Sequence, residues 1–235
     1  MYRGQDIGSR DRLIQRCLQA IRERSAEALK QLLPHIAIFR PSELKDPLQE
    51  WLKTGTLRHK EVAAIALGSL EDPSVIGPLR QSLESEDRRR GRGYEAFLAA
   101  VILALGEVGH GDAVPVLLEL YRCEHDRHLQ VQRRQLVLLA LGSLAHQGSK
   151  RAETELHELL EKGDDLERID ALQELAGAYW SRPQEVPKAF IEQLGRLADR
   201  FPEEEEIGKA ALIALQGLAE VGCKQAEEYF GAQTA

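Results

Sequence analysis

The sequence predicts an all-α protein, a right-handed α-solenoid built from about five or six helical hairpins. The first observation behind this prediction is a phrase of the form Ala-x-x-Ala-Leu-Gly, which recurs along the chain with some variation. The glycines of its copies are Gly68, Gly106, Gly142, Gly177 and Gly217. Such a period of about 35–40 residues is typical of stacked structural repeats rather than of a single globular core.

The second observation is that each phrase is followed by a turn and a second apolar stripe. The phrases are rich in Ala and Leu, which favour helices, and Asp72-Pro73-Ser74 is typical of a turn that opens a new helix. Pro78, Pro115 and Pro187 follow the glycines of their copies at similar offsets, which places them in the first turn of a second helix, where proline is tolerated. Apolar residues then recur at helical spacing, as in Val75, Leu79 and Leu83.

The segment 1–57 fits this pattern less well. It predicts helices near 9–23, 25–38 and 42–53, with Ser25 and Ser42 as N-caps. We therefore expect two parts, an N-terminal cap with an irregular helical repeat at 1–57 and one continuous repeat array at 58–235. A solenoid needs such a cap because its end must shield an apolar face.

The repeated phrase, the short Asp-Pro or Gly-Asp turn and the Val-x-x-Leu that follows together resemble HEAT repeats, and most closely the short subtype named after phycobilisome lyase subunits. The resemblance covers 58–84, 96–122, 133–161, 168–199 and 207–230. It implies a HEAT-like superhelix whose second helices line the concave side and whose first helices line the convex side. It implies little about activity, since the consensus positions are core and turn positions.

Composition narrows the class of protein further. The 235 residues are 43% hydrophobic and 29% charged, as in folded proteins. No apolar stretch approaches the ~20 residues of a membrane span, the start lacks the apolar core of a signal peptide, and the three cysteines are sparse and odd in number. We therefore expect a cytoplasmic protein with free thiols. Residues 151–235 carry 9 basic and 19 acidic residues against 22 and 19 in residues 1–150, so one end should be acidic.

The strongest candidate feature for binding is a basic inter-repeat loop at 86–93. Its arginines, which we expect to seek an anionic partner, are Arg88, Arg89, Arg90 and Arg92. Arg127, Arg133 and Arg134 are expected in the equivalent connection one repeat later, where the two sets would form one basic edge. On the second helices, the expected contact residues off the apolar stripe are Arg80, Gln81, Glu84, Glu119, Arg122, Glu155 and Glu158.

Motifs for chemistry are weaker. Cys123, His125 and His128 are of the ligand types that zinc prefers, but no second Cys/His pair lies nearby in the sequence. Only His157-Glu158 forms the His-Glu dipeptide that HEAT-like di-iron hydroxylases use in several copies. No nucleophile elbow, P-loop or dinucleotide fingerprint is present. We predict no catalytic residue, no metal and no cofactor.

Three functions follow as hypotheses. The favoured one is a non-enzymatic scaffold or adaptor that binds another protein through the concave groove and the basic loop. The alternative is a bilin lyase-like or small-ligand-binding HEAT subunit, in which Tyr121, Arg122, His125 and His128 would hold the ligand. Nucleic-acid binding is disfavoured by the pI near 5.6. Of the aromatic residues, Tyr179 is expected in the core, and Trp180 either fills a turn or anchors a partner.

Overall fold

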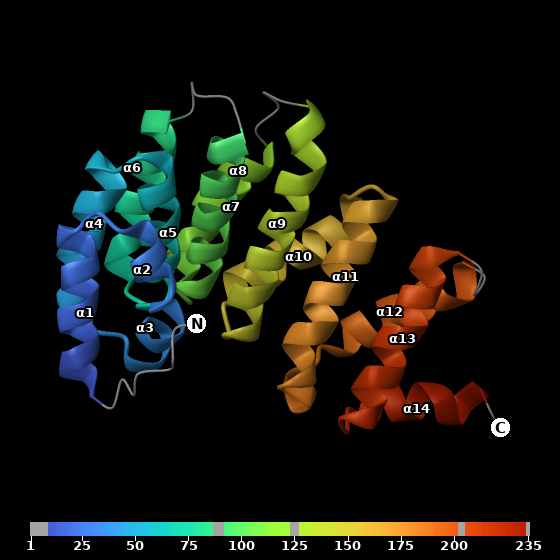
Figure 1. Cartoon of the computed structure of the whole chain (residues 1–235). Coiled ribbons are helices and arrows are strands. Elements are labelled where there is room, and N and C mark those ends of the chain that lie inside the picture. Colours follow the sequence, from blue (N-terminus) through green and yellow to red (C-terminus); the bar gives the residue numbers. More distant parts are fainter. Residues whose placement is uncertain (1–8, 87–91, 123–126, 202–204, 234–235) are drawn as a thin grey trace. The chain divides into compact units, whose positions relative to one another are not determined.

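The computed structural model describes residues 9–86, 92–122, 127–201 and 205–233 (Figure 1). Within these ranges the chain forms fourteen α-helices and four 3-10 turns, and no strand. The predicted all-α repeat fold is thus confirmed. The chain divides into two compact units, residues 1–126 and 127–235, and the division falls in sequence between α8 and α9. The right-handed course of the superhelix across both units stays a prediction, because the placement of the units relative to each other is not determined.

Five hairpins follow residue 56, and each pairs a first helix that contains the repeated phrase with a shorter or more polar second helix. The first helices are α5 (Leu57–Gly68), α7 (Arg92–Glu107), α9 (Arg127–His146), α11 (Asp165–Trp180) and α13 (Glu206–Glu220). The second helices are α6 (Ile76–Glu86), α8 (Val114–Arg122), α10 (Lys150–Lys162), α12 (Lys188–Arg200) and α14 (Lys224–Gln233).

Within each unit the first helices pack side by side. In unit 1, α5 lies along α7; in unit 2, α11 lies between α9 and α13 (Figure 1). Their facing surfaces are built from small residues such as Ala64, Ala104 and Ala140, all buried, which let the helix backbones approach closely. The larger buried side chains, such as Leu67, Phe97 and Leu141, fill the space beside them. Each such side chain contributes about 1.5–3 kcal/mol by leaving water.

Short 3-10 turns lead into three of the second helices. They are η2 (Pro73–Val75), η3 (Gly111–Ala113) and η4 (Pro183–Glu185). The Asp72 carboxylate accepts a hydrogen bond from the Ser74 backbone N–H at 2.9 Å, which caps the first of these turns. Pro78 and Pro115 lie in the first turns of α6 and α8 as predicted, whereas Pro187 is the N-cap residue of α12, just before that helix begins.

The N-terminal segment forms helices too, but not with all of the predicted bounds. These are α1 (Arg10–Arg22), α2 (Ala26–Lys30), α3 (Leu33–Phe39), η1 (Ser42–Leu44) and α4 (Lys45–Thr54). The single helix expected at 25–38 is broken after Lys30, because Pro34 has no N–H to donate and its ring would clash with the carbonyl one turn earlier.

The predicted N-caps of this segment have different outcomes. The Ser25 hydroxyl accepts from the Ala28 N–H at 3.2 Å and caps α2, as predicted. Ser42 is not the N-cap of α4, because it begins the 3-10 turn and Leu44 precedes the helix. An ion pair of 2.9 Å between Lys45 and Asp72 joins this segment to the first repeat within unit 1. The boundary expected between residues 57 and 58 stays a prediction.

Candidate functional site

The second helices of unit 1 bring three of the predicted contact residues together. The Arg80 guanidinium lies 3.1 Å from the Glu84 carboxylate on its own helix and 3.1 Å from the Glu119 carboxylate on α8. All three side chains are exposed. An ion pair in water contributes at most about 1 kcal/mol. Breaking these pairs to form new ion pairs with a partner would therefore cost little free energy. Arg122 is exposed at the end of α8.

A small groove of about 180 Å³ lies beside this surface, between α4 and α6. Its lining residues are Leu52, Lys53, Pro78, Gln81, Ser82 and Ser85. The Ser82 and Ser85 hydroxyls both donate to backbone carbonyls of their own helix. This volume is below the range of about 300–1,000 Å³ that holds a drug-sized ligand, so the groove suits a single side chain.

In unit 2, the predicted contacts on α10 differ in their exposure. Glu155 is half-buried, while Glu158 is exposed and pairs with Lys162 at 3.2 Å. His157, its neighbour, instead turns inward and packs edge-on against Phe190, with ring centroids 5.4 Å apart. Burial lowers the pKa of this imidazole. The His157-Glu158 dipeptide therefore has one side chain inside the unit and one outside.

One groove of unit 2 was missed by the sequence analysis. It lies between α12 and α14 and has a volume of about 510 Å³, which is within the range of ligand-binding clefts. Its lining residues are Lys188, Ile191, Glu192, Gly195, Arg196, Asp199, Gln225, Glu228 and Tyr229. Two residues in the sequence could have indicated this groove. They are Gly195, in the middle of the amphipathic helix α12, and Tyr229, about one repeat later on the last helix.

The Tyr229 ring of α14 rests on the backbone of α12 at Gly195. A Cβ atom on Gly195 would lie 2.8 Å from Cε2 of the Tyr229 ring, so only glycine allows the ring to rest on the α12 backbone. The Tyr229 hydroxyl donates to the Asp199 carboxylate at 3.2 Å. The ring is thus fixed at both ends by α12.

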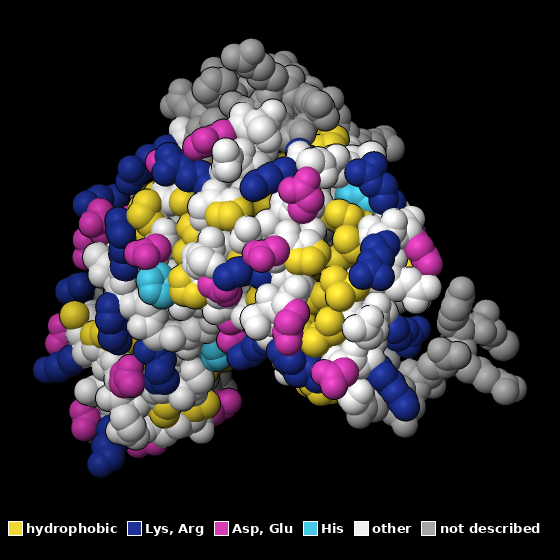
Figure 2. Space-filling model, turned by 90° about the vertical axis from the view of Figure 1, so that its left-hand side faces the viewer, with side chains coloured by type: hydrophobic (Ala, Val, Ile, Leu, Met, Phe, Trp, Pro, Cys, Tyr) yellow, Lys and Arg dark blue, Asp and Glu magenta, His cyan; other side chains and the backbone are white. Residues whose placement is uncertain are grey.

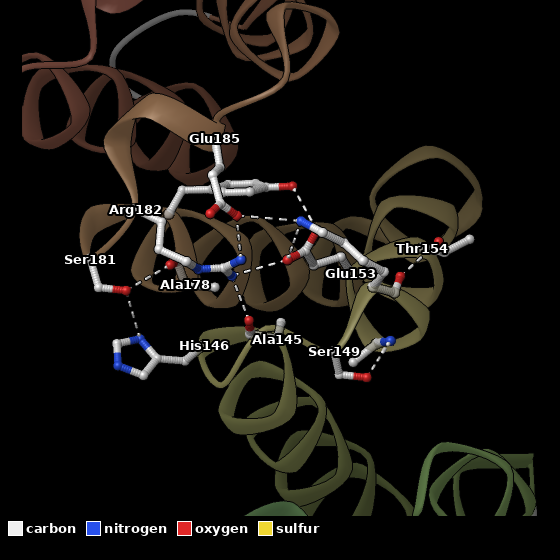
Figure 3. Close-up of polar contacts among 12 residues, drawn as sticks. Ala145, His146, Ser149, Glu153, Thr154, Ala178, Ser181, Arg182 and Glu185 are labelled. Atoms are coloured by element: carbon white, nitrogen blue, oxygen red, sulfur yellow. Dashed lines mark hydrogen bonds and ion pairs between the residues drawn. The ribbon is translucent and has the colours of Figure 1, made fainter. Parts of the chain in front are cut away.

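A second polar cluster in unit 2 is internal. The Arg182 guanidinium donates to the Ala145 carbonyl at 2.6 Å, to Glu153 at 3.0 Å and to Glu185 at 2.9 Å (Figure 3). Glu153 is buried and also lies 3.1 Å from the Lys150 ammonium. Burial raises the pKa of the adjoining Tyr179 phenol, and so does the nearby Glu153 charge.

This cluster joins the end of α9, the start of α10 and the turn η4. Arg182 supplies a second hydrogen bond to the Ala145 carbonyl in the last turn of α9, which also accepts one from the Gly148 N–H just beyond the helix at 2.9 Å. The charges of the cluster pair with one another, so we assign it to stability and not to binding. Tyr179 is buried in the core, as predicted.

Both ends of the basic loop expected at 86–93 belong to helices. Glu86 still belongs to α6, and Arg92 and Gly93 already belong to α7. Arg88, Arg89 and Arg90 lie outside the described residues, as does the Arg92 side chain, so their role in binding stays a prediction.

The arginines expected in the next connection lie in a helix instead. Arg127, Arg133 and Arg134 are all within α9, because that helix begins before the apolar stripe of the repeated phrase. Arg133 is only 8% exposed, and Arg134 pairs with Glu167 of α11 at 3.0 Å. The prediction that Arg133 and Arg134 lie in a basic connecting loop is therefore wrong.

The candidate metal ligands cannot be placed. Cys123 and His125 lie outside the described residues, and so does the His128 side chain. Elsewhere in the described chain, no group of three or more His, Cys, Asp or Glu side chains is arranged to hold a metal ion. Tyr121, expected to line a site for a bilin, is buried with 8% exposure.

The charges of the surface are mixed. Figure 2 shows the side on which α1 and α4 lie, where basic and acidic side chains alternate and hydrophobic side chains are exposed between them. Among the side chains that the structure describes on this face, no continuous basic stripe of the kind that tracks a phosphate backbone is seen. None of the described helices is both long enough and apolar enough to cross a membrane.

Comparison with known proteins identifies the repeat. The family model described as PBS lyase HEAT-like repeat matches residues 98–123, which run from α7 through η3 to the end of α8. No curated protein matches the chain. The matched unit is a structural repeat, so the match describes the architecture and does not assign an activity.

Proposed function

We propose that this HEAT-like repeat protein is a non-enzymatic scaffold or adaptor that binds a segment of another protein along its second helices. The observation that carries the proposal is that neighbouring second helices, in each unit, expose charged side chains beside a groove. In unit 1 these are the Arg80 cluster and the groove between α4 and α6. In unit 2 they are the rim charges of the groove between α12 and α14.

The division of labour between the two helices of a hairpin supports this proposal. First helices contribute many of their residues to the core between repeats: α5 buries seven of its twelve residues and α11 six of its sixteen. The second helices bury one stripe, for example Phe190, Ile191 and Leu194 of α12, and leave the other face to water. Stacked repeats use such a face as an extended binding surface.

The arginines at 88–92 belong to the proposal on sequence grounds. Four guanidinium groups in this short segment would favour an acidic stretch of the partner. The expected cytoplasmic location is likewise a proposal, based on few cysteines. Cys17 and Cys223 are both free and buried.

The test is affinity purification of the tagged full-length protein from its native cell extract, with charge variants run in parallel. Arg80→Glu and Glu119→Arg should each weaken capture of a defined partner, and Arg88/Arg89/Arg90/Arg92→Glu should weaken it as well. The double variant Arg80→Glu/Glu119→Arg keeps an ion pair between α6 and α8, so it separates loss of a contact from loss of folding.

A matched control is Arg10→Glu, which reverses an arginine of similar exposure that pairs with Glu43 of η1, so that neither residue lies on a second helix. Capture should survive this change. If every variant retains the same partners as the native protein, the second helices are not the binding surface and the proposal is wrong.

A further inference from the structure

We propose that the groove between α12 and α14 binds a short peptide segment in which an arginine or lysine stands beside an apolar side chain. This inference deepens the proposed function and rests on it, since it names the class of partner for one part of the second-helix surface. It is carried by the floor, the length and the charge of the groove.

The floor of the groove is apolar and rigid. Ile191 and Gly195 are buried in α12, and the half-buried Tyr229 ring of α14 lies directly against Gly195. The hydrogen bond from the Tyr229 hydroxyl to Asp199 fixes the ring. An apolar side chain that enters the groove therefore meets a surface that needs no rearrangement, which lowers the entropic cost of binding.

The length of the groove fits a peptide. Its residues on α12 run from Lys188 to Asp199, and eleven helical steps of 1.5 Å span about 16 Å. An extended chain advances at most about 3.3–3.6 Å per residue, so about five residues of a partner would cover this distance. With about 510 Å³, the groove holds more than one side chain.

The charge of the rim favours a cationic partner. Three carboxylates, those of Glu192, Asp199 and Glu228, face two cations, Lys188 and Arg196. Lys188 lies 3.6 Å from Glu192 and offsets its charge. Glu228 lines the groove from α14 and is exposed.

The net charge of unit 2 also favours a cationic partner, because residues 127–235 contain 19 acidic and 13 basic residues. An acidic field attracts basic segments and repels phosphate backbones. A basic residue of the partner would pair with Glu228 while its apolar neighbour covers Tyr229.

The experiment is a selection from a displayed library of short random peptides against the full-length protein. Enriched peptides are then measured by fluorescence anisotropy against two variants, Glu228→Lys and Glu227→Lys. These two residues are adjacent and exposed on α14, but only Glu228 lines the groove. A third variant, Gly195→Leu, displaces the Tyr229 ring and so removes the floor of the groove.

The expected result is enrichment of peptides with Arg or Lys next to a large apolar residue. Glu228→Lys should weaken their binding about tenfold, Glu227→Lys should change it less than about twofold, and Gly195→Leu should abolish it. Enrichment of acidic or uncharged peptides would overturn the inference, and so would equal effects of the two lysine variants.

Two further outcomes separate this inference from the proposed function. If the enriched peptides bind the groove variants normally but lose affinity for Arg80→Glu, the groove is not their site and the scaffold function stands on unit 1. If no peptide is enriched, the inference is wrong, while the affinity purification described above decides the scaffold function independently.

Discussion

Gly68 of α5 lies directly against Ala104 of α7. A Cβ atom on Gly68 would come within 2.6 Å of the Ala104 Cα and 2.8 Å of its Cβ. Both residues belong to the repeated phrase, Gly68 at the end of one copy and Ala104 near the end of the next. The phrase therefore encodes a close contact between the backbones of successive first helices.

This contact predicts opposite effects of the same substitution at two glycines of the phrase. Gly68→Ala should lower the free energy of unfolding by about 1–3 kcal/mol, because the backbone of α7 must shift to admit the methyl group. Gly177→Ala should raise it by up to about 1 kcal/mol, because a Cβ there has no neighbour within 4 Å and alanine favours a helix. Urea denaturation followed by circular dichroism measures both.

The prediction fails if both variants shift the urea midpoint in the same direction. Gly177 serves as the matched control, since it holds the same place in its own copy of the phrase. A native-like helical spectrum of Gly68→Ala before denaturant is added would show that only stability has changed.

The different surroundings of the glycines in the repeated phrase show which features of the fold could be predicted from the sequence and which could not. The repeat period predicts that they all lie near the ends of first helices, and they do. What each one touches depends on the following repeat, which has diverged. A Cβ on Gly142 would collide with the Glu174 carboxylate, and one on Gly217 would lie 2.9 Å from the Trp180 indole nitrogen. Trp180 thus packs on the next first helix, although it stays 45% exposed.

The candidate site was predictable where it follows the period. Arg80 and Glu119 are separated by about one repeat in the sequence, so equivalent places on neighbouring second helices explain their ion pair. The groove between α12 and α14 was missed because Tyr229 lies in the last and most irregular copy. Arg133 and Arg134 were misplaced because polar residues at the start of α9 resemble a loop in composition.

The internal pair Arg182–Glu153 should matter more for stability than any exposed pair. Arg182→Ala would leave Glu153 buried with Lys150 as its remaining cation and would take one donor away from the Ala145 carbonyl. We expect a loss of about 2–3 kcal/mol. Arg80→Ala, which breaks exposed pairs, should cost less than about 1 kcal/mol. Equal urea midpoints for the two variants would contradict this assignment.

The ion pair between Asp72 and Lys45, which joins the N-terminal helices to the first repeat, should contribute to stability in a pH-dependent way. Hydrogen bonds from Ser74, then the Lys45 ammonium, lower the pKa of Asp72 to about 2. Because this pKa is below that of the unfolded chain, the carboxylate stabilises the fold above about pH 4, and the contribution is lost as the pH falls towards 2.

Asp72→Asn should therefore cost about 1 kcal/mol at pH 7 and much less at pH 2.5. Thermal unfolding of the two proteins at both pH values measures the difference. Asp112→Asn is a suitable control, since Asp112 is an exposed aspartate in the equivalent turn η3. A cost for Asp72→Asn that is independent of pH would show that the charge is not involved.

Ionisation of Glu174 should destabilise the fold near neutral pH, whereas ionisation of Asp72 stabilises it. Burial of its side chain, which lies over Gly142 of α9, raises the pKa of Glu174 to about 7, and the nearby Asp170 charge contributes. Because the folded pKa is above that of the unfolded chain, the protonated form stabilises the fold fully below about pH 4.5. This contribution is lost as the pH rises through 7.

Glu174→Gln removes the ionisation and keeps the shape of the side chain. As the pH rises from 5 to 8, the free energy of unfolding of the variant should therefore increase by about 1–2 kcal/mol relative to that of the native protein. This value is smaller than the full pKa shift would give, because the side chain is partly hydrated. Urea midpoints of both proteins at pH 5, 6, 7 and 8 give this difference directly. Glu161→Gln, at an exposed carboxylate on α10, should leave the difference flat. A flat difference for Glu174→Gln as well would mean that the carboxylate is fully hydrated and does not press on Gly142.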